Sequence, residues 1–122
     1  MFFENNPRVV VDADPSDFWF YQHGLCMLAG NHGHKLKPVE LPGVMAAYRP
    51  EMWGTTKYRH AFSGHIHQER SGEKHGAQWE TLRTVAPPDA FSHQHGYHSG
   101  RELTAITYSA TRGRGMRQYV PV

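Results

Sequence analysis

The feature that most limits what this chain can fold into is the stretch His60–His67, HAFSGHIH, where apolar residues lead into a glycine and then into two histidines one residue apart. Residues i and i+2 of an extended chain project to the same side, so His65 and His67 can direct two imidazoles at one point or at neighbouring points. Gly64 permits a sharp bend where a strand ends. A second cluster, Asn31-His32-Gly33-His34, follows its own apolar run. Strand ends that carry imidazoles beside glycines predict a metal site in an α/β or α+β fold.

Length and composition indicate one globular domain over residues 1–122. The hydrophobic share of 39% and the charged share of 20% are typical of a folded domain, and a net charge of +2 is too small to indicate a nucleic-acid binder. Cys26 is the only cysteine, which excludes an internal disulfide and fits a reducing compartment. The first residues lack the features of a signal peptide, and no apolar run approaches the length of a membrane span. We therefore expect a cytoplasmic protein with no membrane partner, located in the bacterial host cytoplasm if it is phage-encoded.

The order of apolar runs, turns and prolines predicts a mostly β chain with one helix near its middle. Pro42 in the first turn predicts a helix over Pro42–Tyr48, which Pro50 would end. Glu51–Thr56 and Gln68–Lys74 are expected to form loops. Strands are expected at segments that are β-branched, aromatic or alternating: Arg8–Ala13, Phe18–Gln22, Leu25–Ala29, Tyr58–Ser63, Gln78–Val85, Leu103–Tyr108 and Met116–Val120. The predicted fold class is therefore α+β.

Several segments across nearly the whole chain form a recognisable set, of which Gly64-His65-Ile66-His67 is the most specific. The others are Asn6-Pro7-Arg8-Val9, the aromatic strand before His23-Gly24, His32-Gly33-His34-Lys35, Leu41-Pro42-Gly43-Val44-Met45-Ala46, Arg49-Pro50 with Trp53-Gly54, Phe91, Gly96-Tyr97 and Ser99-Gly100-Arg101. Together they resemble the C-terminal half of a calcineurin-like metallophosphoesterase, and most of all the phage-encoded members. Members of that family are four-layer α/β/β/α sandwiches that hold metals at strand ends and hydrolyse phosphomonoesters or phosphodiesters. The resemblance implies a partial metallophosphoesterase-like sandwich here.

The resemblance also implies a ligand set. It makes His32 and His65 ligands of one metal and His67 a ligand of the other, with Mn, Zn, Fe or Ni as the divalent ion. Gly30-Asn31-His32 could instead match the family's earlier GNH motif, in which Asn is a ligand and His a general acid. We favour the later H-G motif because of the flanking strand and the lysines that follow. On that interpretation Asn31 is not a ligand, and it and His34 stand behind the ligands or at the surface.

On this interpretation the family's D-x-H, G-D-x-x-D and GNH motifs are absent from the chain. Three neutral histidines cannot balance two divalent ions without the carboxylates of those motifs. We therefore do not expect the chain to be an active enzyme by itself, and the isolated chain could hold no metal. Half of the family's sheet would also be missing, which would leave an exposed edge and an apolar face. A homo-oligomer or a protein partner is expected to cover them, and a split enzyme, an oligomer and a recruited remnant all stay open.

Three functions follow from these features. The first is a truncated or split metal-dependent phosphoesterase that acts on a nucleic acid or a nucleotide. The second is a catalytically inactive, phage-encoded binding protein, an inhibitor or adaptor of a host protein (including an anti-defence protein), on a remnant of the same fold. The third is a phosphate- or nucleic-acid-binding module that uses the C-terminal arginines Arg101, Arg112, Arg114 and Arg117, with Arg101 as the candidate phosphate contact.

Three sets of residues have simpler interpretations. The histidines His93, His95 and His98 could form a second metal cluster, although solvated loop histidines are more common. The arginines are expected to line a solvated rim of a β-hairpin. The aromatic residues Trp53, Trp79 and Tyr97 could stack on bases, although packing is the more common role.

Overall fold

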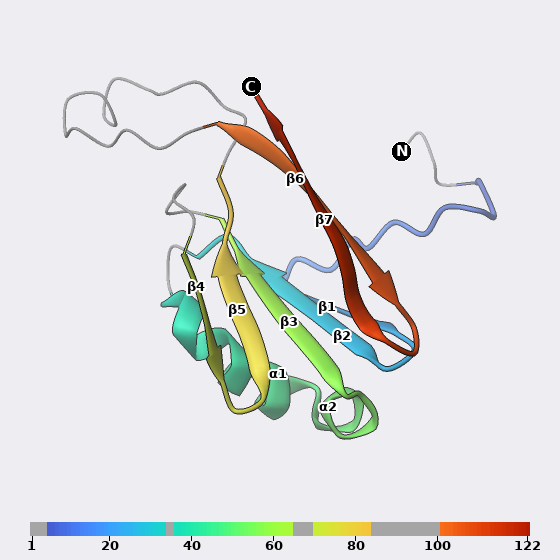
Figure 1. Ribbon diagram of the computed structural model, residues 1–122. Helices are drawn as coiled ribbons and strands as arrows, with labels where there is room; N and C mark the ends of the chain where they lie inside the picture. Colours follow the sequence, from blue (N-terminus) through green and yellow to red (C-terminus); the bar gives the residue numbers. More distant parts are fainter. Residues whose placement is uncertain (1–4, 34–35, 65–69, 84–100) are drawn as a thin grey trace.

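The computed structural model describes residues 5–33, 36–64, 70–83 and 101–122, and in them the protein is an α+β fold made mostly of strands (Figure 1). The strands are β1 (Phe18–His23), β2 (Cys26–Asn31), β3 (Tyr58–Ser63), β4 (Arg70–Lys74), β5 (Ala77–Thr81), β6 (Glu102–Ser109) and β7 (Gly113–Pro121). The helices are η1 (Pro38–Glu40), α1 (Leu41–Tyr48) and α2 (Pro50–Thr55). The coarse prediction of a mostly β, α+β chain with a mid-chain helix is confirmed.

Five of the strands form one mixed sheet in the order β1-β2-β3-β5-β4, and β6 and β7 form a separate hairpin. Strands β2, β3 and β5 are parallel, whereas β1 and β4 run antiparallel at the two edges. The predicted turn at His23-Gly24 is confirmed, because Gly24 joins β1 to β2 with a φ of +57°. Parallel neighbours end at the same edge of a sheet, so the residues after β2 and β3 are brought together.

One face of the five-stranded sheet is covered by the helices, which lie behind it in Figure 1. Met27 and Ala29 of β2 and Ala61 of β3 pack there against Leu41 and Met45 of α1, and all five are at most 1% exposed. Aromatic and aliphatic residues from β1, β5 and α2 surround this cluster. The alternation of the strands sends their intervening residues to the opposite face.

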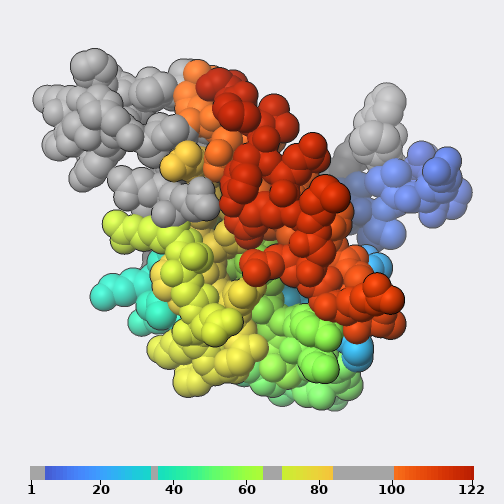
Figure 2. Space-filling model, viewed as in Figure 1, coloured from blue at the N-terminus to red at the C-terminus, as the bar shows by residue number. Residues whose placement is uncertain are grey.

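The β6–β7 hairpin crosses that opposite face, and Figure 2 shows its atoms lying over the sheet. Two contacts attach the hairpin turn to β2 and the turn before it. The amide of Leu25 donates to the carbonyl of Ala110 at 2.7 Å, and the thiol of Cys26 donates to the carbonyl of Ser109 at 3.2 Å. The sheet therefore lies between a helical layer and a hairpin layer. None of the helices in the described residues is long and apolar enough to cross a membrane.

Three local predictions are wrong. Arg8–Ala13 belongs to no sheet: Arg8 lies in a turn, and nothing in the described residues pairs with the residues that follow, whereas a strand needs a partner. Glu51–Thr56 is mostly helix α2, because Pro50 begins a new helix at its first position after ending the previous one. Gln68–Lys74 contains β4, whose charged residues suit the exposed edge of the sheet.

Candidate functional site

The described parts of the two sequence clusters that predicted a metal site, residues 31–33 and 60–64, meet at the carboxyl ends of β2 and β3. The strands are parallel neighbours, with Asn31 opposite Ser63 at their last paired positions. Just beyond, the amide of Gly64 donates a hydrogen bond of 3.1 Å to the carbonyl of His32. The structure thus brings His32 beside the glycine that directly precedes His65 in the sequence.

A pocket of about 320 Å³ opens at this edge of the sheet. Its lining comes from the ends of four strands and the residues that follow them: Trp19, Asn31, His32, Phe62, Ser63, Gly64, Leu82 and Arg83. Two of these residues, Asn31 and Ser63, each carry a buried side-chain oxygen with no hydrogen-bond partner in the described part of the chain. Buried polar atoms are nearly always paired with protein, ordered water or an ion. Oδ1 of Asn31 and Oγ of Ser63 are therefore suited to a polar ligand at this edge.

The predicted site residues are distributed unevenly over the described chain. His32 is exposed just after β2, and Asn31 is the last residue of that strand. His34, His65 and His67 lie outside the described residues, as do His93, His95, His98 and Tyr97. In residues 5–33, 36–64, 70–83 and 101–122 no group of three or more His, Cys, Asp or Glu side chains is arranged to hold a metal.

Arg101, the candidate phosphate contact, does not line the pocket at His32. It directly precedes β6, and its carbonyl accepts a hydrogen bond of 3.0 Å from the amide of Val122. The arginine that does line the pocket is Arg83, which sequence reasoning missed. Its guanidinium lies 3.7 Å from the carboxylate of Glu102 at the start of β6. The predicted strand Gln78–Val85 placed Arg83 inside it, whereas β5 ends at Thr81 and Arg83 follows two positions later, so the sequence carried no signal for this residue.

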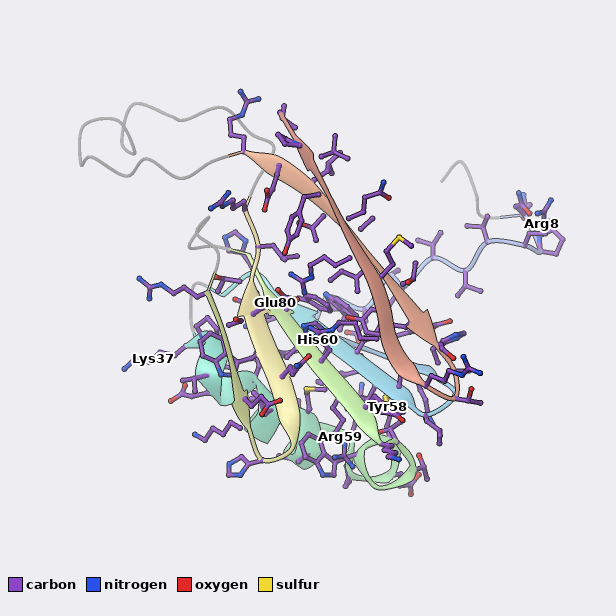
Figure 3. The ribbon with its side chains drawn as sticks, in the orientation of Figure 1. Arg8, Lys37, Tyr58, Arg59, His60 and Glu80 are labelled. Carbon is purple, nitrogen blue, oxygen red and sulfur yellow. The ribbon has the colours of Figure 1, made fainter. Side chains whose placement is uncertain are left out.

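A buried polar cluster, which we call the latch, joins the hairpin to the sheet and consists of His60, Glu80, Tyr108 and Arg117. Figure 3 shows His60 on β3 and Glu80 on the adjacent β5, and each is 3% exposed. Nε2 of His60 is 2.7 Å from the Glu80 carboxylate, and Nδ1 is 2.6 Å from the Tyr108 hydroxyl. Arg117 donates from both Nη atoms to the two carboxylate oxygens of Glu80, one of these bonds being 2.7 Å long. Strands β3 and β5 of the sheet and strands β6 and β7 of the hairpin each supply one member.

The electrostatics of the latch follow from this geometry. Burial opposes ionisation of Glu80, but the hydrogen bonds and charges of His60 and Arg117 outweigh it and lower the pKa of that carboxyl to about 2. Burial, with the negative charge of Glu80, raises the pKa of Tyr108 well above its usual value. Glu80 is therefore ionised, and Tyr108 neutral, over the physiological range.

The structure corrects the prediction for one C-terminal arginine and confirms the simpler role of two tryptophans. Arg117 was expected on a solvated rim, but it is half-buried on Glu80, whereas Arg112 and Arg114 are exposed as expected. Packing, the simpler role for the tryptophans, is observed: Trp53 and Trp79 pack against the core, and Trp53 lies under the Arg59 guanidinium at 4.2 Å.

Comparison of the chain with protein-family models, with curated proteins and with solved structures found no match.

Proposed function

We propose that this chain is the metal-binding half of a phosphoesterase, with His32, His65 and His67 as its ligands to divalent metal. The observation that carries the proposal is the hydrogen bond between Gly64 and His32, because it joins the ends of the two strands that lead into the histidine clusters. Gly64 is the first residue of the GHIH segment, so this segment begins beside His32.

The surroundings of His32 fit a cation and an anionic substrate. The unpaired oxygens of Asn31 and Ser63 suit a metal-associated water or a ligand group, since both are acceptors and the Ser63 hydroxyl can also donate. Arg83 adds a cationic side chain to the same pocket, where it would attract a phosphate. A divalent ion held there would supply Lewis acidity toward a phosphate ester.

The proposed substrate class is a phosphodiester of a nucleic acid or a nucleotide. The carboxylates that would bridge and neutralise the metals have to come from outside residues 1–122, because the motifs that carry them in the resembling family are absent from these residues. We accordingly propose a half-site that binds metal and becomes active only with a partner that supplies those groups.

The first test is metal binding after equilibration with Mn²⁺ or Zn²⁺, measured by calorimetry and by metal analysis of the dialysed protein. We expect the His65→Ala/His67→Ala and His32→Ala variants to weaken binding by more than about 100-fold, beyond the effect of losing an outer-shell partner. His23→Ala, at an exposed histidine that ends β1, is the matched control and should bind as the wild type does.

Loss of binding in the control as well, or equal binding in all variants, would contradict the ligand assignment. A folded chain that binds neither metal would favour the alternative function, an inactive binding protein. In that case a variant in which His32, His65 and His67 are all replaced by alanine should retain its affinity for the protein partner.

A further inference from the structure

The segment Arg8–Ala13, RVVVDA, was predicted to be a strand but belongs to no sheet in the described residues. It has the β-branched composition of a strand, yet it pairs with no other segment in the described residues. Val10 is 95% exposed and Val11 is 41% exposed. Figure 3 shows Arg8 well away from the sheet, and Figure 1 shows the segment leaving the start of β1 and projecting from the body. An apolar extended segment of this kind is stabilised when it joins a sheet.

The β6–β7 hairpin offers such an edge. Within the described part of the chain β7 pairs with β6 alone, so its other side presents unpaired backbone groups. The outer face of the hairpin, away from the latch, is also apolar. Its side chains Leu103, Met116 and Val120 are 58%, 69% and 52% exposed. A two-stranded sheet gains stability from a third strand.

The charges of the segment and of the sheet edges favour β7 as the edge that the segment joins, and they favour an antiparallel direction. The segment is basic at its start, with Arg8, and acidic at its end and just beyond, with Asp12 and Asp14. The turn before β7 and its first residues are basic, with Arg112 and Arg114 exposed. An antiparallel arrangement places the aspartates beside these arginines, whereas a parallel one places Arg8 there. Like charges across strands are destabilising and opposite charges stabilising.

The other edges fit less well. Strand β4 protects its edge with Arg70, Glu73 and Lys74 around a glycine, a pattern that discourages pairing. Strand β6 begins with Glu102, which would repel the acidic end of the segment in an antiparallel arrangement. In a parallel arrangement Arg8 would meet the Glu102 carboxylate, which already lies 3.7 Å from the Arg83 guanidinium, and β6 offers the aspartates no cationic side chain. Strand β1 is the strand into which the segment itself leads.

We propose that residues 8–13 add as an antiparallel strand to the free edge of β7 in a second copy of this chain. Because the segment and the edge belong to the same chain, two copies can exchange segments reciprocally and close a twofold dimer. The exchange pairs the free edge of β7 and covers Val10 and Val11 in each copy. It is independent of the metal site, since none of its residues is a proposed ligand.

The direct test is a mixed cross-link between two singly substituted proteins of different size, one carrying Val10→Cys and the other Met116→Cys. These two exposed positions lie opposite each other in the antiparallel register that sets Asp12 against Arg114. The native thiol, Cys26, is buried and contributes little background. Under mild oxidation we expect a covalent dimer that contains one of each, and none when Glu51→Cys on α2 replaces Val10→Cys. A second test is the dimer dissociation constant from sedimentation. Asp12→Arg/Asp14→Arg should raise it about tenfold, and Arg112→Asp/Arg114→Asp added to that variant should restore it.

Circular dichroism of each variant checks that the fold is retained, which we expect because the substituted side chains are exposed. A mass equal to that of one chain at every concentration would overturn the proposal. So would a dimer that ignores the charge reversal. A cross-link that forms only when both cysteines are on one chain would show that the segment folds back on its own β7, and would overturn it too.

Discussion

Replacing Glu80 by Gln should remove the centre of the latch that holds the β6–β7 hairpin to the sheet. The substitution keeps the size of the side chain but removes the charge that both His60 and Arg117 contact. Lowering the pKa of this carboxyl from 4.5 to about 2 corresponds to about 3 kcal/mol of folding free energy at neutral pH. Breaking a buried ion pair typically costs about 3–5 kcal/mol, which agrees with this value. We therefore expect Glu80→Gln to lower the free energy of unfolding by about 3 kcal/mol at pH 7.

The pH dependence supplies a sharper signature than the loss alone. The folded-state pKa of Glu80 lies below its ordinary value, so its contribution is complete above about pH 4.5 and is lost as the pH falls toward 2. The stability difference between the wild type and the variant should shrink over that interval, to about half by pH 3. The variant itself should show a flatter acid dependence.

The assay is urea unfolding followed by tryptophan fluorescence and circular dichroism at pH 7, 5 and 3.5, at one fixed low protein concentration because association adds apparent stability. Glu73→Gln, at an exposed position on β4, is the matched control and should change stability by less than about 0.5 kcal/mol. A loss below about 1 kcal/mol for Glu80→Gln, or a difference that is the same at pH 7 and pH 3.5, would refute the assignment of the latch as an ion-paired support.

Two further substitutions test neighbouring contacts. Tyr108→Phe removes the hydroxyl that lies 2.6 Å from Nδ1 of His60, and it should cost about 1 kcal/mol in urea unfolding; an unchanged midpoint would mean that water replaces the hydroxyl without loss. Gly30→Ala places a methyl group where ring atoms of Trp19 lie 2.5 Å away, so it should displace the indole, shift its fluorescence and cost about 1–3 kcal/mol; an unaltered spectrum would show that Trp19 does not rest on Gly30.

The site divides into a part that local pattern could predict and a part that it could not. The strand ends at His32 and Gly64 were predictable, because each follows an apolar run that is long enough to be a buried strand. The place of Arg83 and the unpaired oxygens of Asn31 and Ser63 were not. Whether a polar atom at a strand end finds a partner depends on which loops surround it, and sequence spacing carries no information about that.

The sequence by itself determined the elements whose signals are local: the turn at Gly24, the buried strands β2 and β3, and the helix whose first turn contains Pro42. Only the tertiary structure decided which polar residues became part of the core. Glu80 and Arg117 are 37 residues apart, and each alone resembles a solvated strand residue. They are buried because the hairpin packs on the sheet face that carries Glu80, and a charge is stable there only with its partner. The tertiary structure likewise decided that Arg8–Ala13 belongs to no sheet in the described residues, because a strand requires a neighbouring strand and composition cannot supply one.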